Sequence, residues 1–389
     1  MTARFALLTA SGLAYFVGWT ALYPVLPRFV QEELGGGGFE VGLAVGSFGL
    51  TSALLRPWVG RWGDRHGRRP MVVYGQLVVA ASLLGFLVVD DIASAVALRL
   101  LFGAGEAAAF TGMATAVQDI APPERRGEAA SYWSMATYGG VATGPLLGQL
   151  VYERLGYDWV WVGAAALCVV GAALGFAAPR PPAAAVRAAP GAAGRRGFLH
   201  PAARLPGLAL LAAMIAYAGY VSFVALYVSD REVVSPGVVF TVYASLIVVF
   251  RLLGAKLPDR LGAARVSTFS LTALALGLTI MAAWPAAPGL FTGLVVFAAG
   301  MALNFPALLS LVVREATDDD RTHAVASISV FFDIGFGLGG TIVGAVVALS
   351  NVRWGFFAGA LIALSGVLAL RSLRQPSSAA AAPAAVTPG

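Results

Sequence analysis

Twelve long apolar stretches constrain this chain of 389 residues more than any other feature of its sequence. A helix that crosses the hydrocarbon core of a membrane needs roughly 20 mainly apolar residues. The stretches that reach this length span residues 5–29, 39–60, 70–89, 92–117, 129–151, 159–178, 206–228, 235–256, 266–284, 288–313, 323–349 and 354–370. They predict an all-α membrane protein with 12 transmembrane helices.

The composition excludes other classes of protein. Only 12% of the residues are charged and 58% are hydrophobic, whereas an ordinary soluble domain carries about 25% charged residues. So few charges cannot cover a soluble enzyme, and they exclude a disordered chain or a nucleic-acid-binding domain. We therefore expect the lipid bilayer as the partner, and no nucleic acid. The single cysteine, Cys168, excludes an intramolecular disulfide.

The basic residues predict the orientation of the helices. With the N-terminus in the cytoplasm, 19 of the 26 Lys and Arg residues fall in cytoplasmic segments and four in outer loops. Such a bias sets the orientation of membrane proteins. We expect a multi-pass protein of the bacterial cytoplasmic membrane with both termini in the cytoplasm. Five charged residues remain inside the predicted helices: Arg56, Arg99, Glu106, Arg251 and Asp333.

An internal repeat divides the chain into two halves. The pattern R-x7-D-R-x-G begins at Arg56 and again at Arg251, 195 positions later. The triplet Ala-Leu-Tyr begins at Ala21 and at Ala225, 204 positions later. Such repeats are typical of transporters that bind substrate between their halves. We predict a six-helix bundle over 1–178, a cytoplasmic linker over 179–205, a second, pseudo-symmetric six-helix bundle over 206–370 and a disordered cytoplasmic tail over 371–389.

The segment Gly60–Pro70, GRWGDRHGRRP, joins the second and third predicted helices. Gly60, Gly63 and Gly67 allow close helix approach and a tight turn, and Asp64 can form charge-assisted hydrogen bonds with the arginines around it. The alternative is that these arginines only determine topology. The order of glycines and charges is more specific than a generic basic loop requires.

Two charges on the fourth predicted helix need partners. An arginine at the centre of a membrane helix costs roughly 2.5–3.5 kcal/mol. Arg99 lies seven residues before Glu106, on the same helix face. The two Cα atoms are about 10 Å apart along the axis, so a direct pair requires both side chains to stretch. Arg99 is alternatively a structural anchor near the outer interface.

Asp333 lies about halfway along the eleventh predicted helix. An acidic residue in a membrane helix is a functional hypothesis by default. Because burial favours the neutral form of a carboxyl group, Glu106 and Asp333 are candidates to bind and release a coupled proton. For Asp333 two alternatives remain, a structural pair with Arg251 or another polar group, and an attraction for cationic substrates.

The fifth predicted helix carries small residues at a spacing of four. Gly140, Gly144 and Gly148 share one face, which allows tight packing against another helix. Pro145 removes a backbone hydrogen bond and predicts a kink. The alternative is an ordinary packing seam.

These strings resemble motifs of the major facilitator superfamily, and of its 12-helix drug:proton antiporter branch, over nearly the whole chain. The resemblance implies that the segment between helices 2 and 3 latches the two halves in the outward-facing state. It implies that Asp119, at the end of the fourth helix, completes this charge relay. The implied latch consists of Gly60, Asp64, Arg65, Gly67, Arg68, Arg69 and Asp119.

The same resemblance implies roles for the other motifs. The fourth helix, with Arg99 and Glu106, is associated with proton coupling, and the fifth helix with export. Together with Asp333 of the eleventh helix, Arg99 and Glu106 are the candidate proton-coupling residues. Helices 1, 4, 7 and 10 line the central cavity of the family. The implied cavity residues are Trp19, Tyr23, Glu106, Tyr217, Tyr220, Phe223, Tyr227, Asn304 and Asp333. Aromatic residues in these positions are alternatively packing or interfacial residues.

The energy source follows from what the sequence lacks. It contains no G-x4-G-K-[ST] nucleotide loop, so we expect no cofactor, no metal and a proton gradient as the driving force. The leading hypothesis is proton-coupled efflux of amphipathic drugs or metabolites by a monomeric transporter that is not an enzyme. The alternative is a proton symporter or facilitator for a nutrient such as a sugar or an organic acid. A membrane sensor is a remote alternative, because no output domain is apparent.

Overall fold

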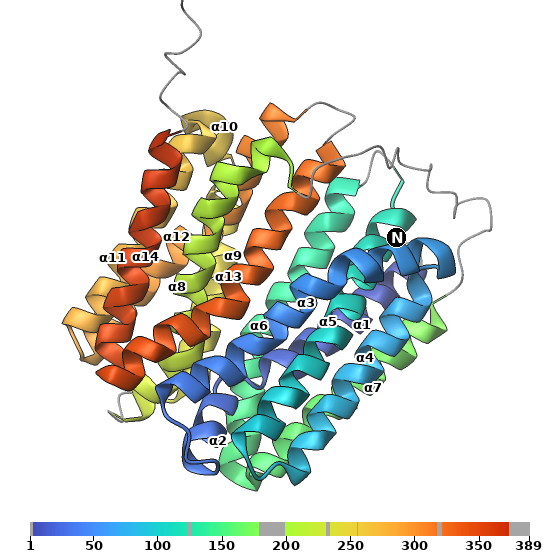
Figure 1. Cartoon of the computed structure of the whole chain (residues 1–389). Helices are drawn as coiled ribbons and strands as arrows, with labels where there is room; N and C mark the ends of the chain where they lie inside the picture. The colour runs from blue at the N-terminus through green and yellow to red at the C-terminus, as the bar shows by residue number, and fades with distance from the viewer. Residues whose placement is uncertain are drawn as a thin grey trace, which may run out of the picture.

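The computed structural model describes residues 3–122, 126–178, 199–230, 234–254, 256–316 and 321–372, whose regular structure is helical throughout (Figure 1). The first group of helices comprises α1 (Ala3–Thr20), α2 (Leu26–Glu32), α3 (Gly38–His66), α4 (Arg68–Gly85), α5 (Ile92–Ile120), α6 (Arg126–Leu155) and α7 (Tyr157–Ala177). The second comprises α8 (Arg204–Ser229), α9 (Pro236–Gly254), α10 (Leu257–Leu261), α11 (Ala263–Ala283), α12 (Ala287–Glu315), α13 (Arg321–Leu349) and α14 (Val352–Ser372). Short 3₁₀ turns precede α5 and α8.

Ten helices in the described part of the chain are long and apolar enough to cross a membrane. They correspond to ten of the 12 predicted spans, and the predicted all-α membrane fold is confirmed. The other two predicted spans correspond to α6 and to α1 with α2. α1 and α6 pack directly against each other.

The first predicted span, residues 5–29, is not one continuous helix. α1 ends at Thr20 and α2 begins at Leu26, with a turn between them. Pro24 explains the break, because proline has no backbone N–H and disfavours helical geometry in the residue before it. That residue is Tyr23, so the break places its side chain between the two groups of helices, against Phe240 of α9.

We refer to α1–α7 as the first half and to α8–α14 as the second half. Within each half, neighbouring helices pack extensively, and the two halves meet mainly where α3 packs on α13 and α6 on α9. α8 begins at Arg204, slightly before the predicted second bundle. Residues 179–198 of the predicted linker and 373–389 of the predicted tail lie outside the described residues.

Packing contacts show which positions of the two halves are equivalent. Gly105 of α5 lies against Val79 of α4, and Gly300 of α12 lies against Leu274 of α11. Each residue of the second pair follows its counterpart by 195 positions, the separation between Arg56 and Arg251.

Equivalent residues in the first helices of the two halves, α1 and α8, are also 195 positions apart. Gly144 lies against Thr20 of α1, and Gly339 lies against Ile215 of α8. Both pairs are again 195 positions apart. The alignment of Ala21–Tyr23 at 204 positions is therefore wrong, because the contacts fix a different register for α8.

The halves touch at one end of the bundle, which we call the distal end because it lies opposite the end where α1 begins and α14 ends (Figure 1). Gly42 and Gly46 of α3 lie against Gly340 and Gly337 of α13, so close that a Cβ would collide with the facing backbone. At the other seam, the Thr241 hydroxyl of α9 donates a hydrogen bond of 3.0 Å to a carbonyl of α6. Small residues therefore let the two halves close together at the distal end.

Candidate functional site

A cavity of about 390 Å³ lies between the two halves. This volume is in the range of pockets that enclose small organic molecules. It is lined from α1, α3, α5, α6, α8, α9, α12 and α13 by Tyr15, Phe16, Trp19, Tyr23, Phe48, Gly49, Ser52, Arg56, Glu106, Phe110, Trp133, Ser134, Thr137, Tyr138, Val141, Tyr217, Tyr243, Ala244, Ile247, Arg251, Met301, Phe305, Ser329, Phe332, Asp333 and Phe336. The helices implied by the resemblance contribute, and α3, α6, α9 and α13 contribute as well.

Arg56 of α3 is held between two carboxylates. Its Nε lies 2.7 Å from Oδ2 of Asp333, an ion pair whose atoms are not aligned for a hydrogen bond. Its Nη2 lies 3.4 Å from Oε1 of Glu106, and the guanidinium lies 5.0 Å from the ring centre of Phe110. The Ser52 hydroxyl donates a hydrogen bond to Glu106. The pair with Asp333 joins the two halves, because α3 and α13 belong to different ones.

This geometry decides between the partners that the sequence left open. Glu106 pairs with Arg56 and Ser52, not with Arg99. Asp333 pairs with another polar group, Arg56, and not with Arg251. Sequence spacing along one helix could not find Arg56, because the pairs form between helices.

Arg99 is not among the residues that line the cavity, whereas Glu106 and Asp333, the other two candidate proton-coupling residues, are. Its side chain is buried, and it donates hydrogen bonds of 3.0 Å and 3.2 Å to the carbonyls of Ala44 and Val45 on α3. The rings of Phe48 and Phe102 lie 4.6 Å and 4.5 Å from its guanidinium. These contacts fit the structural alternative, in which Arg99 anchors α5 to α3.

Arg251 of α9 has a different environment. Its guanidinium carbon lies 4.4 Å from the ring centre of Tyr138 on α6. Its Nε is buried without a hydrogen-bond partner, and no described residue forms an ion pair with it. Arg251 therefore brings to the cavity wall a positive charge that no side chain among the described residues balances by direct contact.

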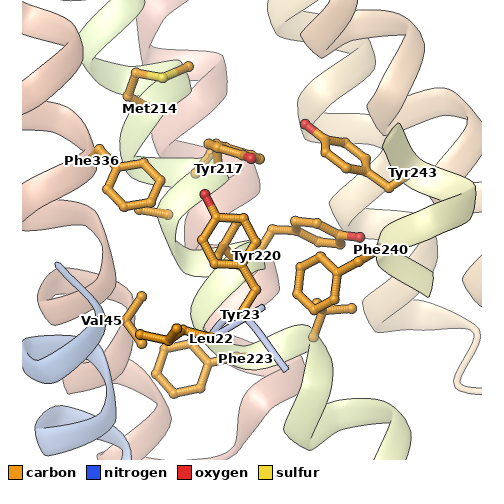
Figure 2. Close-up of a cluster of buried hydrophobic side chains, with 14 of the residues drawn as sticks. Leu22, Tyr23, Val45, Met214, Tyr217, Tyr220, Phe223, Phe240, Tyr243 and Phe336 are labelled. Atoms are coloured by element: carbon orange, nitrogen blue, oxygen red, sulfur yellow. The ribbon is translucent and has the colours of Figure 1, made fainter. Parts of the chain in front are cut away.

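The aromatic residues predicted for the cavity divide into two groups. Trp19, Tyr23 and Tyr217 line it. Tyr220 and its neighbours further along α8 lie below Tyr217, in the packed aromatic cluster that Figure 2 shows. The prediction that they line the cavity is wrong for Tyr220, Phe223 and Tyr227.

The distal closure explains this division. Tyr23 of the first half packs on Phe240 of the second, with ring centres 5.6 Å apart (Figure 2). This contact ends the cavity, and Tyr220 beyond it packs against Phe297 at 4.8 Å. Asn304 of α12 is also buried and does not line the cavity, which corrects its predicted role.

Two arginines of the predicted latch make contacts within the first half. Nε of Arg68 donates a 3.3 Å hydrogen bond to Oδ2 of Asp119, the residue expected to complete the charge relay. Arg69 donates to the carbonyl of Phe176, whose ring lies 4.1 Å from its guanidinium. The side chain of Asp64 lies outside the described residues.

The glycines of the latch segment differ in what they allow. Gly67 has a φ of +88°, which favours glycine, and it forms the predicted tight turn between α3 and α4. Gly63 approaches Met71 of α4 closely. Gly60 faces open space, so the predicted close approach at Gly60 is wrong. Arg65 is exposed.

The glycines of α6 form the tightly packed face that their spacing predicts. Gly140, Gly144 and Gly148 all lie against the backbone or side chains of α1 and the turn that follows it. Pro145 lies inside α6, and its carbonyl faces Gly237 of α9 in the other half. One face of α6 therefore fixes it to its own half while the other forms a seam between the halves.

The internal repeat also relates residues of the cavity wall to one another. Sequence reasoning identified the repeat but did not apply it to the cavity. Ten pairs of lining residues are 195 positions apart. They are Phe48 and Tyr243, Gly49 and Ala244, Ser52 and Ile247, Arg56 and Arg251, Glu106 and Met301, Phe110 and Phe305, Ser134 and Ser329, Thr137 and Phe332, Tyr138 and Asp333, and Val141 and Phe336. Applying this separation to every residue near Arg56 would have found most of the missed wall residues.

Known proteins resemble the chain in sequence and in structure. Residues 8–235 and 233–388 match the Major Facilitator Superfamily. An uncharacterised MFS-type transporter of Salmonella typhimurium is 31% identical over 359 residues, which cover 90% of this chain and 91% of the relative.

Two solved structures match the fold. A mutant of the nucleoside transporter NupG has a TM-score of 0.79 at 15% identity, over 96% of this chain and 100% of that one. The human organic anion transporter MFSD10 has a TM-score of 0.71 at 17% identity, over 95% and 99%. At these identities the likeness shows the fold alone.

A cavity enclosed between two pseudo-symmetric helical halves is the architecture of a secondary transporter. Because the family match extends over most of its length, the chain belongs to the Major Facilitator Superfamily. It is a multi-pass membrane transporter of small-molecule substrates and not an enzyme. Transporters of this family work without a cofactor, and the described residues contain no cluster of metal-ligating side chains.

Proposed function

We propose that the chain exports amphipathic small molecules in exchange for protons by alternating access, as its resemblance to the drug:proton antiporter branch implies. The observation that carries this proposal is Arg56, held between Glu106 and Asp333 in a largely aromatic cavity. In the proposed orientation, the membrane is the bacterial cytoplasmic membrane and both termini are cytoplasmic.

Protonation of either acid changes the balance of charge around Arg56. A proton on Asp333 removes the charge that attracts Arg56 across the two halves, and a proton on Glu106 removes the attraction within the first half. With both acids ionised, these three side chains carry one excess negative charge, which a proton on either acid removes. The proton therefore alters how firmly the halves are joined, which is the coupling that alternating access needs.

The direction of transport is proposed from the packing of α6 and from topology. The glycine face of α6 against α1 matches the string that resembles the export motif. With the termini in the cytoplasm, the closed distal end faces outward and the cavity serves the cytoplasmic side. Substrate would then bind from the cytoplasm, and Arg68 with Asp119 would belong to the latch of the opposite conformation.

The second candidate is proton-coupled co-transport of an organic acid. The unpaired Arg251 in the cavity wall favours it, because a guanidinium that lacks a carboxylate partner can bind one on a substrate.

The test is proton flux in proteoliposomes that contain the purified full chain and a pH-sensitive dye. The candidate substrates are three matched naphthalene compounds: 2-naphthoate, 2-naphthylmethanol and 2-naphthylmethylammonium. We expect at least one to move protons, and we expect Glu106→Gln and Asp333→Asn to abolish that movement. Glu33→Gln, which neutralises an exposed acid outside the cavity, is the control. Full proton flux in both cavity variants would contradict the proposal.

A further inference from the structure

We infer that the substrate of this cavity is an organic anion, whose carboxylate or similar oxyanion binds Arg251 while an aromatic or apolar body fills the remaining space. The inference rests on the proposed function in taking the cavity as the substrate site. It goes further in naming the charge that the substrate carries and the residue that binds it.

The first argument is the repeat itself. Arg56 and Arg251 occupy equivalent positions of the two halves, and Arg56 has a carboxylate partner on each side. The equivalent of Glu106 beside Arg251 is Met301, and the equivalent of Asp333 is Tyr138. The scaffold thus provides the same two partner positions around Arg251, and neither holds a negative charge.

The second argument is the geometry of the guanidinium. The guanidinium of Arg251 is a planar group, and its carbon lies over the Tyr138 ring, 4.4 Å from the ring centre. The N–H donors of arginine lie in that plane and match both oxygens of a carboxylate. Its Nε is buried and has no hydrogen-bond partner. The tyrosine contact therefore positions the cation and leaves donors for a ligand.

The third argument compares the charged groups that a cationic ligand and an anionic ligand would meet in the cavity. Among the described residues, four charged side chains line the cavity, and both acids among them contact Arg56. A cationic ligand would have to displace Arg56 from Glu106 or Asp333. An anionic ligand displaces nothing at Arg251. The expectation that Asp333 attracts cationic substrates is therefore replaced by an anion at the opposite arginine.

The rest of the wall describes the body of the substrate. Rings from both halves surround the space, among them Trp19, Trp133, Phe305 and Phe332, and the hydroxyl groups of Ser134 and Ser329 are equivalent across it. Aromatic walls favour flat apolar groups. An aromatic carboxylate satisfies both the rings and Arg251.

The charges also fix how binding responds to pH. The titratable groups that face the cavity are Glu106, Asp333 and five tyrosines: Tyr15, Tyr23, Tyr138, Tyr217 and Tyr243. Tyrosine stays neutral at ordinary pH. With both acids ionised the four charges cancel, so a bound anion leaves one excess negative charge, which a proton on Glu106 or Asp333 removes. Anion binding and protonation therefore strengthen each other, which favours the second candidate, co-transport, over the exchange proposed first.

Binding of tritiated 2-naphthoate to the purified full chain in nanodiscs tests the inference. We expect 2-naphthoate to bind more tightly than 2-naphthylmethanol and 2-naphthylmethylammonium, and to bind more tightly as the pH is lowered from 8 to 6. Arg251→Gln should weaken 2-naphthoate by about 10–100-fold, the usual effect of losing a charged hydrogen bond, and leave the alcohol unchanged. Arg251→Lys should retain part of the affinity, and Arg154→Gln, at an exposed arginine, should retain all of it.

A second variant keeps the test independent of any misfolding of the first. Met301→Glu places a carboxylate at the position equivalent to Glu106. It should pair with Arg251 and weaken the binding of 2-naphthoate about tenfold, whereas Met301→Gln should not.

Equal binding of the three compounds to the wild type, or unchanged 2-naphthoate binding in Arg251→Gln, overturns the inference. Arg251-dependent binding without proton flux contradicts only the proposed proton coupling. Proton flux driven by the cationic compound alone supports that coupling and overturns the inference.

Discussion

Arg56 and Arg251 occupy equivalent positions in the two halves, yet their surroundings differ in charge. Arg56 contacts Glu106 and Asp333, whereas Arg251 contacts the ring of Tyr138 and has no acidic partner in the described residues. The backbone repeat has kept both arginines at the cavity and changed the groups around them. A pseudo-symmetric scaffold can thus carry one arginine for coupling the halves and another for binding.

The largest expected effect comes from removing each arginine in turn and measuring unfolding of the purified protein in detergent. Arg56→Gln leaves two buried carboxylates without their partner, so we expect a loss of about 3–5 kcal/mol. Arg251→Gln removes a charge that has no acidic partner among the described residues, so we expect a change below about 1 kcal/mol. Equal destabilisation by the two variants would show that the charge environments are not different.

The triple variant Arg56→Gln, Glu106→Gln, Asp333→Asn is the matched control for the first of these measurements. It removes the charges together and leaves no uncompensated carboxylate, so it should recover most of the stability lost in Arg56→Gln. Failure to recover would mean that Arg56 contributes through packing, including its contact with Phe110, and not through charge.

A second comparison concerns the two seams that close the distal end. Gly42 of α3 and Gly237 of α9 are equivalent by the same separation of 195 positions. A Cβ on Gly42 would meet the backbone carbonyl of Gly340, which cannot move aside. A Cβ on Gly237 would meet Cβ of Gln149 at 3.0 Å and Cα of Leu146 at 3.1 Å, which need shift by only a few tenths of an ångström.

We therefore expect Gly42→Ala to disfavour distal closure by about 1–3 kcal/mol, the usual effect of overpacking, and Gly237→Ala to have a smaller effect. The measurement uses a cysteine introduced at Thr137 in the cavity, since the native Cys168 is buried. Its labelling by an impermeant thiol reagent from the distal side should increase in Gly42→Ala. Equal labelling in the two variants would show that the seams are equally tight.

Some of these features could be predicted from the sequence and others could not, for physical reasons. Apolar length predicted ten confirmed spans, because hydrocarbon thickness sets helix length almost alone. The family resemblance assigned Arg68 and Asp119 to one charge relay, and the two residues form a hydrogen bond. Arg56 as the partner of both acids could not, because α3, α5 and α13 meet only in the folded structure.

The wrong prediction of one long span at α1 and of too many cavity residues on α8 both came from patterns along a single helix. Pro24 signalled the break after α1, but apolar length outweighed it in the prediction of one long span. Tyr217 and Tyr220 have the same side chain on the same helix, yet Tyr217 lines the cavity and Tyr220 lies in the packed cluster beyond the contact of Tyr23 with Phe240. Periodicity identifies the face of a helix, whereas the depth at which a neighbour closes over that face depends on the other half.

The smallest expected effect concerns the N-termini of α5 and α12, which are again equivalent. The Asp91 carboxylate accepts a 2.8 Å hydrogen bond from the backbone N–H of Ser94, and this bond holds the pKa of Asp91 below its ordinary value. Because the folded-state pKa is lowered, the stabilisation is present above the ordinary carboxyl pKa and is lost as the pH falls through the folded-state value.

The equivalent residue, Ala286, has no side-chain cap. We expect Asp91→Ala to lower the melting temperature at pH 7 more than at pH 3, and Ala286→Asp to stabilise α12 by about 1 kcal/mol. Ala286→Asn, which can cap without a charge, separates the hydrogen bond from the attraction of a carboxylate to the helix dipole, and no gain from either variant would mean that the two helix ends are not equivalent in their capping geometry.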